Sequence, residues 1–464
     1  MRATASAIFG LLIAATFAAG GKDEIEIVPA APPAVPAKVA ITAADPDVKR
    51  MIDDLGSDDW RAREKAGRDL AQKGEKALPH MRAALLATDN PEVQRRLAVL
   101  VRKLDRERLI EPKRITYSAK NKTAKEIFAE IAKQTGYKID FNGGPETKYS
   151  FEFNNTPFWQ AADAVATAVG FTIYAEYDDD SIRIYNNEST NPHMAYAGPF
   201  RFVATNIQTS RNVQLSGIPR RGGQQRNNEY MTLSFQVQSE PKNPMLGITQ
   251  PVLTEAKDDL GGSLLPPAND GRNGTYRSGY YNGGYRGHNS YMNVNLTRGD
   301  KAATTIKSLK GRVGIVLLSG SVQELAIADP LKAKKHVAVG RNVQMELESF
   351  EEDANQKGTY LASFTAKKLA PADPERGDDY AWSQNLWQRL ELHDDKGNKY
   401  YCYGPNVHDN NGGTVKMVVV FGTEDRRTGR PGAVKFGPPK KLQLNEWLTI
   451  THEVEFAFKD IPLP

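Results

Sequence analysis

The pattern of apolar and polar residues changes twice along the chain. From Asp47 to about Arg108, apolar residues recur at the spacing of one helix face. Over residues 113–187, strand-like and helical patterns follow one another along the chain. From Gly198 onward, apolar and polar residues alternate, which is typical of half-buried strands. The pattern therefore predicts a multi-domain α+β chain: a short helical segment, a small α+β domain and mainly antiparallel β-sheet.

The helical segment is predicted to span residues 45–110. Ser57 and Asp58 are residues that often cap the start of a helix, and Gly74 stands where a helix should stop. A further helix opens at Asn90-Pro91, since proline is tolerated in a first turn. That helix carries one apolar stripe, made of Val93, Leu97, Leu100 and Leu104.

Two stretches of this segment are similar to each other. DDWRAR and NPEVQRR lie about one solenoid repeat apart, with Trp60 matching Val93 and Arg63 matching Arg96. The segment therefore resembles a short HEAT-like helical repeat. Stacked helix pairs usually bind proteins, but a segment with so few repeats is better suited to bracing a neighbour. We expect residues 45–110 to brace the domain beside them.

Residues 113–187 show one order of elements twice. A strand, a helix over 123–135 and a strand over 136–141 form the first unit. The second unit has Asn155-Thr156-Pro157 before its helix, and it ends in a strand over 181–185. The pattern predicts a small domain built from two strand–helix–strand units.

This order resembles the short N-terminal domain of secretins and TonB-dependent receptors. The stretches that carry the resemblance are KTAKEIFAEIAKQTGYKIDF, NNTPFWQAADAVATAVGFTIY and DDDSIRIYN. The resemblance implies an α+β interaction domain of the kind that makes contacts within envelope assemblies. No stretch of the sequence resembles the long secretin barrel domain or a receptor barrel, so the transport function of those families is not expected.

Two mainly antiparallel β-sandwiches are predicted over residues 198–335 and 336–464. Each half has a strand that ends in Asp-Asp-x-Gly and, later, an Asp with Pro-Leu close behind it. A duplication of the sandwich is therefore a hypothesis. The ending FAFKDIPLP resembles the close of a domain from uncharacterised exported bacterial proteins, which implies no function. The stretches that match are 252–264 with 388–400 and 305–331 with 439–463.

The first residues predict export. Met1-Arg2 supplies positive charge, Ala7 to Ala19 is apolar, and Ala18-Ala19-Gly20 offers the small residues that a signal peptidase needs. The apolar run is shorter than the roughly 20 residues that cross a bilayer. We interpret residues 1–20 as a signal peptide and residues 21–44 as a Pro/Ala-rich linker.

Export predicts a periplasmic or secreted protein with no transmembrane segment after cleavage. The one cysteine of the chain is Cys402, so neither a lipid-bearing N-terminal cysteine nor an intrachain disulfide is expected. The 61 basic and 56 acidic side chains are interleaved and leave a net charge of only +5. This balance argues against nucleic acid as a partner.

A Gly/Tyr-rich stretch interrupts the first predicted sandwich over residues 266–293. Arginine and aromatic residues of this kind can stack on bases or sugars, but low complexity favours a disordered insertion. Sugars can also pack against exposed rings. The rings of the second sandwich that we consider as possible ligand-facing aromatics are Trp382, Trp387, Tyr400 and Tyr403.

No catalytic motif stands out in the sequence, and we predict no catalytic residue, cofactor or metal site. The best cluster is His393 with Asp394 and Asp395, where a hydrolytic or Ca²⁺ site competes with a turn whose carboxylates cap backbone N–H groups. We favour the turn. Cys402 lies between two tyrosines in a predicted strand and is interpreted as a packing residue.

These features favour a non-catalytic scaffold or interaction protein of the cell envelope. Its expected partners are envelope or extracellular proteins, with polysaccharide as a second class of ligand. A carbohydrate-binding sandwich is the alternative, and a secreted hydrolase at His393, Asp394 and Asp395 is a less favoured one.

Overall fold

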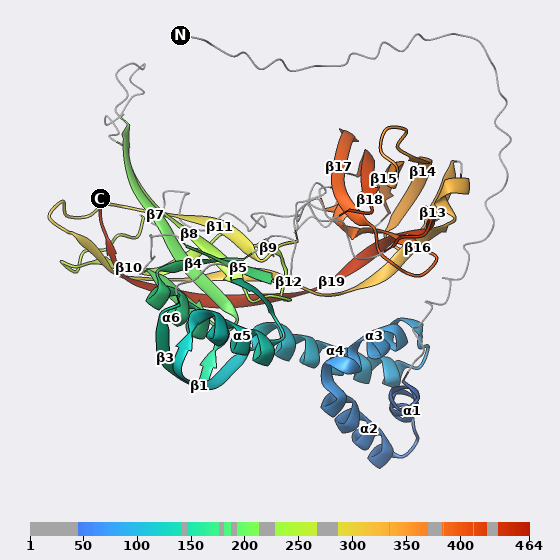
Figure 1. Ribbon diagram of the computed structural model, residues 1–464, viewed down its shortest axis with the longest axis horizontal. Helices are drawn as coiled ribbons and strands as arrows, with labels where there is room; N and C mark the ends of the chain where they lie inside the picture. Colours follow the sequence, from blue (N-terminus) through green and yellow to red (C-terminus); the bar gives the residue numbers. More distant parts are fainter. Residues whose placement is uncertain are drawn as a thin grey trace, which may run out of the picture. The chain divides into compact units, whose positions relative to one another are not determined.

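The computed structural model describes most of the chain from residue 45 onward (Figure 1). The predicted signal peptide, the linker and Trp382 lie outside the described residues, as does most of the insertion 266–293. The described part is a mixed α and β protein in which antiparallel strands predominate. The described residues are 45–141, 146–175, 181–186, 193–212, 228–266, 286–333, 335–369, 383, 385–411, 413–424 and 435–464.

The helical segment contains four α-helices, and local sequence explains their ends. The Asn90 side chain accepts hydrogen bonds from the first turn of α4, and α2 stops before Gly74, which has a φ of 59°. Asp59, rather than Ser57 or Asp58, caps α2. Within the described residues, no helix is long and apolar enough to cross a membrane. The helices are α1 Pro46–Asp54, α2 Trp60–Lys73, α3 Leu78–Ala87 and α4 Pro91–Ile110, with the 3₁₀ turn η1 Gly74–Lys76.

The two matched stretches of this segment differ in burial. Val93 is 7% exposed and belongs to the helical core, whereas Trp60 is 60% exposed. The Arg61 guanidinium lies over the Trp60 ring, 5.6 Å from the ring centroid. The HEAT-like match therefore pairs a buried position with an exposed one.

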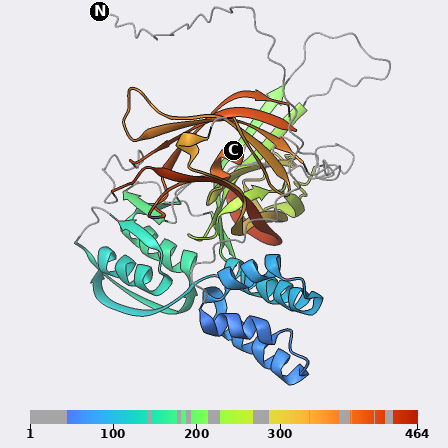
Figure 2. The same ribbon diagram turned by 90° about the vertical axis from the view of Figure 1, so that its right-hand side faces the viewer.

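The segment 113–187 contains its elements in the expected order. Helices α5 and α6 lie side by side, as Figure 2 shows in teal, and their apolar faces share a core around Phe128, Phe158 and Trp159. Each helix ends at a glycine with positive φ, Gly136 and Gly170. Strands β1 and β3 pair antiparallel, and β2, β5 and β4 form a second sheet. The elements are β1 Arg114–Thr123, α5 Ala124–Thr135, β2 Lys138–Phe141, β3 Lys148–Pro157, α6 Phe158–Val169, β4 Phe171–Ala175 and β5 Ser181–Asn186.

Three larger sheets follow. One has the strand order β11-β8-β7-β6, the second β13-β14-β15-β18-β17, and the third β10-β12-β19-β16 with β9 beside β12. The 3₁₀ turns η2 and η3 cover Pro330–Lys332 and Leu386–Arg389. The strands are β6 Met194–Ala197, β7 Phe200–Asn212, β8 Asn228–Ser239, β9 Met245–Ile248, β10 Val252–Asp258, β11 Asn289–Leu296, β12 Thr305–Ala328, β13 His336–Val339, β14 Val343–Glu352, β15 Thr359–Lys368, β16 Leu390–Asp394, β17 Tyr401–Asn410, β18 Thr414–Gly422 and β19 Pro439–Pro462.

Strands β12 and β19 are shared by two hydrophobic cores. Each has 24 residues, and they pair antiparallel from Thr305↔Pro462 to Ala328↔Lys441. In the first core, Phe456 of β19 stacks on Phe202 of β7, with ring centroids 5.2 Å apart. The second core, formed with β14, β15 and β18, takes up the other ends of the two long strands.

This sharing corrects the predicted division into 198–335 and 336–464. The first core contains residues from the end of β19, among them Phe456 and Phe458, and the second contains Leu325 from β12. The physical reason is strand length: 24 residues far exceed the roughly 5–6 that a typical strand needs, so both long strands run through both cores. The two β regions are interleaved rather than consecutive.

The two β regions repeat one local structure. β10 ends at Asp258 and β16 ends at Asp394, and each aspartate accepts a hydrogen bond from the backbone N–H four residues on, at 2.6 and 2.7 Å. Gly261 and Gly397 take the same place in the two turns, with φ values of 87° and 81°. After each turn, the backbone N–H of a buried residue donates a hydrogen bond to a carbonyl oxygen of the strand before the turn.

The helical segment contacts the middle of β12 through two arginines. Arg82 Nη2 and Arg108 Nη2 donate to the Ser319 carbonyl oxygen at 2.5 and 2.7 Å, and buried Asp105 forms ion pairs with both arginines. Ser319 lies at a register shift of the β12–β19 ladder, where its carbonyl is turned out of the regular pairing. The segment thus contacts the β region.

Candidate interaction surface

Within the described residues, the aromatic side chains predicted to face a ligand do not form an exposed platform. Trp382 lies outside the described residues. The prediction for Tyr400 is wrong: its ring is 1% exposed, fills the second core, and its hydroxyl donates to the Gly437 carbonyl. Trp387 is partly buried against the same core, and the Tyr403 hydroxyl donates to the Glu424 carbonyl at 2.7 Å.

The Asp394 carboxylate stabilises the turn after β16. Oδ1 accepts from the backbone N–H groups of Lys396 and Asn398 at 3.0 and 2.7 Å, and Oδ2 accepts from the Gly437 N–H at 2.9 Å. Burial opposes its ionisation, but these hydrogen bonds outweigh burial and hold the pKa of Asp394 at about 2. Both carboxylate oxygens thus accept hydrogen bonds from backbone N–H groups, as expected for a carboxylate that caps a turn.

His393 has its own partners on the sheet surface. Its Nε2 lies 3.1 Å from Glu391 Oε2, and Lys399 Nζ lies 2.7 Å from the other oxygen of that carboxylate. Burial raises the pKa of Glu391, but these partners outweigh it and hold the value at about 2. An ionised Glu391 and an ionised Asp394 carry no proton for general acid catalysis. Within the described part of the chain, no group of three or more His, Cys, Asp or Glu side chains could hold a metal ion.

Two buried polar groups that the sequence did not suggest join the small α+β domain to the first β region. Asp163 on α6 forms a bidentate ion pair with Arg201 on β7, at 2.8 and 2.7 Å, and also accepts from the Tyr196 hydroxyl at 2.8 Å. Burial raises the pKa of Asp163, while these partners oppose the shift. The face of β6 and β7 that carries Tyr196 and Arg201 is therefore covered by α6.

The second buried group is Glu240, which follows β8. Its Oε2 accepts from the Tyr137 hydroxyl at 2.7 Å and from the Lys113 N–H at 3.0 Å, while its Oε1 has no hydrogen-bond partner within the described residues. Burial raises its pKa to about 7, although both hydrogen bonds work in the opposite direction. In the sequence, this glutamate is only one of many loop carboxylates, so no local signal marks it.

An apolar surface with a cationic rim lies around β13. Leu331, Val337 and Val339 are 46%, 47% and 64% exposed. Lys335 comes directly before the strand and Arg341 shortly after it, and both are exposed. We call these residues, with the exposed Lys332, the β13 patch. Large apolar side chains that gather on one exposed face mark interaction sites more often than single exposed ones do.

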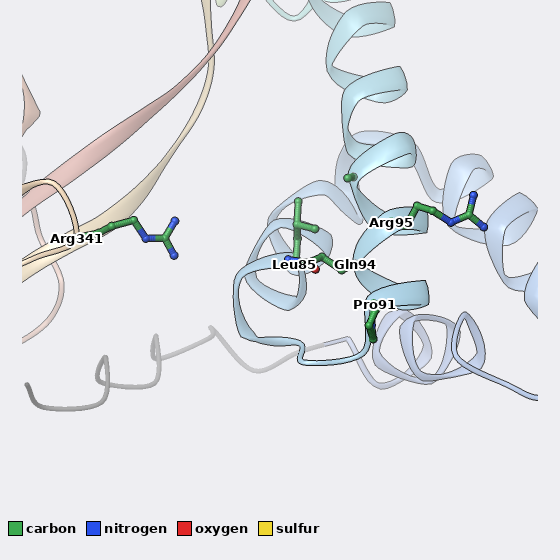
Figure 3. A pocket seen from close by; sticks show the side chains of 6 residues that line it. Leu85, Pro91, Gln94, Arg95 and Arg341 are labelled. Carbon is green, nitrogen blue, oxygen red and sulfur yellow. The ribbon is translucent and has the colours of Figure 1, made fainter. Parts of the chain in front are cut away.

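The cationic end of the β13 patch borders a shallow hollow beside α4, with a volume of about 520 Å³ (Figure 3). Arg341 extends toward Leu85 and Gln94, whereas Arg95 points away and forms an ion pair with Glu92 at 3.0 Å. The first turn of α4 adds the partial positive charge of a helix N-terminus there, and the Asn90 side chain accepts from two of its N–H groups. The residues that line the hollow are Leu85, Pro91, Gln94, Arg95, Ala98 and Arg341.

Comparisons with known proteins do not assign this surface. No family model and no curated protein matches the chain. A conserved domain protein from Bacillus anthracis is 9% identical, with a TM-score of 0.12 over 57% of this chain and 90% of that chain. A chain from the basal body of the Salmonella SPI-1 type III secretion injectisome (proteins InvG, PrgH and PrgK) is 10% identical, with a TM-score of 0.13 over 75% of this chain and 92% of that chain. TM-scores this low carry no argument.

Proposed function

We propose that the protein is a non-catalytic, exported scaffold of the cell envelope that binds another protein through the β13 patch. The observation that carries the proposal is the exposure of Val337 and Val339 on one face of β13, between Lys335 and Arg341. Full burial of an exposed valine contributes roughly 1.5–3 kcal/mol, so covering these two half-exposed side chains contributes about half of that each, and the cations at the rim select the orientation of a partner.

The same proposal gives a role to the rest of the chain. The HEAT-like segment braces β12 through Arg82 and Arg108, and the secretin-like α+β domain is fixed by the buried Asp163–Arg201 pair. The two β regions form a duplicated sandwich, which is supported by the matching turns at Asp258 and Asp394. These parts hold the patch on a stiff support, as a scaffold requires.

Photo-crosslinking in the native cell envelope tests this function. A benzophenone amino acid in place of Val339 should crosslink one defined protein, and that protein, once purified, should bind the full chain. The matched control carries the same amino acid at Tyr291, which is 50% exposed on β11. A partner captured equally at both positions, or a purified partner that binds a Val337→Glu chain as well as the unchanged chain, would contradict the proposal.

The two alternatives lack support of this kind. A sugar-binding platform cannot include Tyr400, because its ring is buried in the second core. The Tyr403 hydroxyl already donates to the Glu424 carbonyl. At the hydrolase cluster, Asp394 is held by backbone N–H groups and His393 by Glu391. We therefore propose protein binding rather than either alternative.

A further inference from the structure

The β13 patch has a counterpart in the first β region. Ala195 on β6 pairs with Phe202 on β7, and Ala338 on β13 pairs with Met345 on β14. In both hairpins the alanine and its partner point into a core. Side chains alternate along a strand, so the neighbours of each alanine point outward: Met194 and Tyr196 on β6, Val337 and Val339 on β13.

The outward faces of the two hairpins differ in what covers them. On β6, Tyr196 is partly buried against the core that contains α6, and its hydroxyl donates to Asp163. Arg201, on β7, lies with its guanidinium 5.5 Å from the centroid of the Trp159 ring. Helix α6 thus covers this face with aromatic and acidic side chains. On β13, the equivalent valines are about half exposed or more.

From this comparison we infer that the β13 patch binds an amphipathic α-helix of a partner protein, with an apolar and acidic face, laid across β13 as α6 is laid across β6. The inference rests on the proposed function and names the partner's chemistry. Val337 and Val339 offer the apolar contact, and a helix covers such a pair with residues at i and i+3 or i+4.

Charge decides which kind of helix the patch favours. On the first hairpin, Arg201 meets the acidic Asp163 of α6. On the second, the exposed cations of the patch lie before and after the two valines. Two carboxylates lie close to them: Glu346 on β14 pairs with Val337 across the ladder, and Glu324 on β12 accepts from the Asn342 N–H beside Arg341. The three cations of the patch, Lys332, Lys335 and Arg341, outnumber these two carboxylates, so acidic residues on the partner helix are favoured.

The α6 of a second copy does not fit this role. In its own chain, α6 already buries Trp159 and Asp163 against β6 and β7. Freeing it would expose Trp159 and the other apolar side chains that α6 buries in its own core, which strongly disfavours such an exchange. We therefore infer that the helix expected over β13 comes from another protein and is not the α6 of a second copy.

A designed peptide pair tests the inference with the full chain from residue 21 onward. The acidic probe is a helical peptide of about 18 residues, with leucines on one face and glutamates along both borders of that face, and the basic probe has lysines in place of the glutamates. Fluorescence anisotropy should show at least tenfold tighter binding of the acidic probe. Val339→Asp should weaken that binding at least tenfold, and the Lys335→Glu, Arg341→Glu pair should reverse the preference.

Four controls accompany this test. Val407→Asp alters another exposed valine, 48% exposed on β17, and should leave binding unchanged. An acidic probe with a central proline cannot form a continuous helix and should bind weakly. Circular dichroism should show that each variant of the chain remains folded, and Val339→Arg, which keeps the patch cationic, should weaken binding as well.

Several outcomes would overturn the inference. These are equal affinity for the acidic and basic probes, full binding by the proline peptide, and unchanged binding to the Val339→Asp chain. Sedimentation that shows a dimer lost in Val339→Asp would identify a second copy as the occupant instead. If the probes fail while crosslinking at Val339 still captures a defined protein, the inference fails and the proposed function stands. If crosslinking fails while the acidic probe binds as expected, the patch has the inferred preference for an acidic helix, but the proposed partner in the cell envelope is contradicted.

Discussion

Lys440 Nζ lies 2.6 Å from Asp329 Oδ1 at one end of the β12–β19 pair, and Lys307 and Asp460 make the same contact at 2.8 Å at the other end. Both aspartates also have positive φ, 45° and 53°. The two ends of the long ribbon are therefore built alike. This is the arrangement expected of two related units in which one long strand of each unit contributes residues to the core of the other.

The shared strands predict that the β regions cannot fold apart. A chain of residues 336–464 lacks Leu325 and Ile327, and a chain ending at 335 lacks Phe456 and Phe458. Each should bind a dye for exposed apolar surface, and residues 336–464 alone should show no cooperative unfolding, because the core is open on one side. Co-expression of residues 45–335 with 336–464 should restore a cooperative transition for this β region. Cooperative unfolding of residues 336–464 alone would argue against a shared ribbon.

The contact between the helical segment and β12 depends on Asp105. Asp105→Ala leaves the guanidinium groups of Arg82 and Arg108 near one carbonyl without a counter-charge, so we expect a loss of roughly 3–5 kcal/mol in the free energy of unfolding. Urea unfolding measures this loss. The control is Glu107→Ala on the same helix, whose exposed ion pair with Lys103 should cost at most about 0.5 kcal/mol. Similar losses for both variants would show that Asp105 has no special role.

Glu240 predicts a pH dependence of stability. Its pKa is about 7 in the folded chain, mainly because of burial, against an ordinary value of 4.5. Between these values the unfolded chain has released a proton that the folded chain keeps, so stability should fall as pH rises from 4.5 through 7, by up to about 3 kcal/mol. Glu240→Gln should remove this part of the slope in urea unfolding series at several pH values. A variant with the unchanged slope would assign it to other groups.

The turns at Asp394 and Asp258 predict matched effects on stability. Asp394→Ala should cost about 1–3 kcal/mol because three partly buried backbone N–H groups lose their acceptor, and Asp258→Ala should cost a similar amount. The Asp394→Ala, Asp395→Ala double variant should change stability only. Since the pKa of Asp394 is lowered to about 2, its contribution should persist at neutral pH and disappear as pH falls toward 2. A hydrolytic activity lost in the double variant at retained stability would restore the hydrolase alternative.

Export predicts the N-terminus of the mature protein. Expressed with its first twenty residues, the chain should be cleaved near Ala18-Ala19-Gly20, so that intact mass corresponds to a start close to Gly21. Ala19→Leu, which enlarges a small residue near the cleavage point, should slow processing. Ala5→Leu, the same substitution far from that point, is the control. An uncleaved protein in the soluble extracellular or periplasmic fraction would contradict the signal peptide.

Sequence alone determined the local structure of this protein. Helix ends are set by neighbouring residues, so Asn90 and Gly74 marked them correctly. The alternation of apolar and polar residues marked the strands, because successive side chains of a strand point to opposite faces. The Asp394 turn could be predicted because its carboxylate lies close in sequence to the N–H groups that it caps. The matching stretches also pointed to two similar β regions.

Only the tertiary structure decided what those elements bury. The pairing of β12 with β19 joins residues far apart in sequence, and no local pattern records that each strand serves two cores. Tyr400 is an aromatic residue of the kind that can face a ligand, but the strands around it place its ring in a core. β6 and β13 carry equivalent outward positions, but α6 packs over β6 and partly buries Tyr196, whereas Val339 on β13 is exposed. Burial is a property of neighbours in space, and those neighbours come from distant parts of the chain.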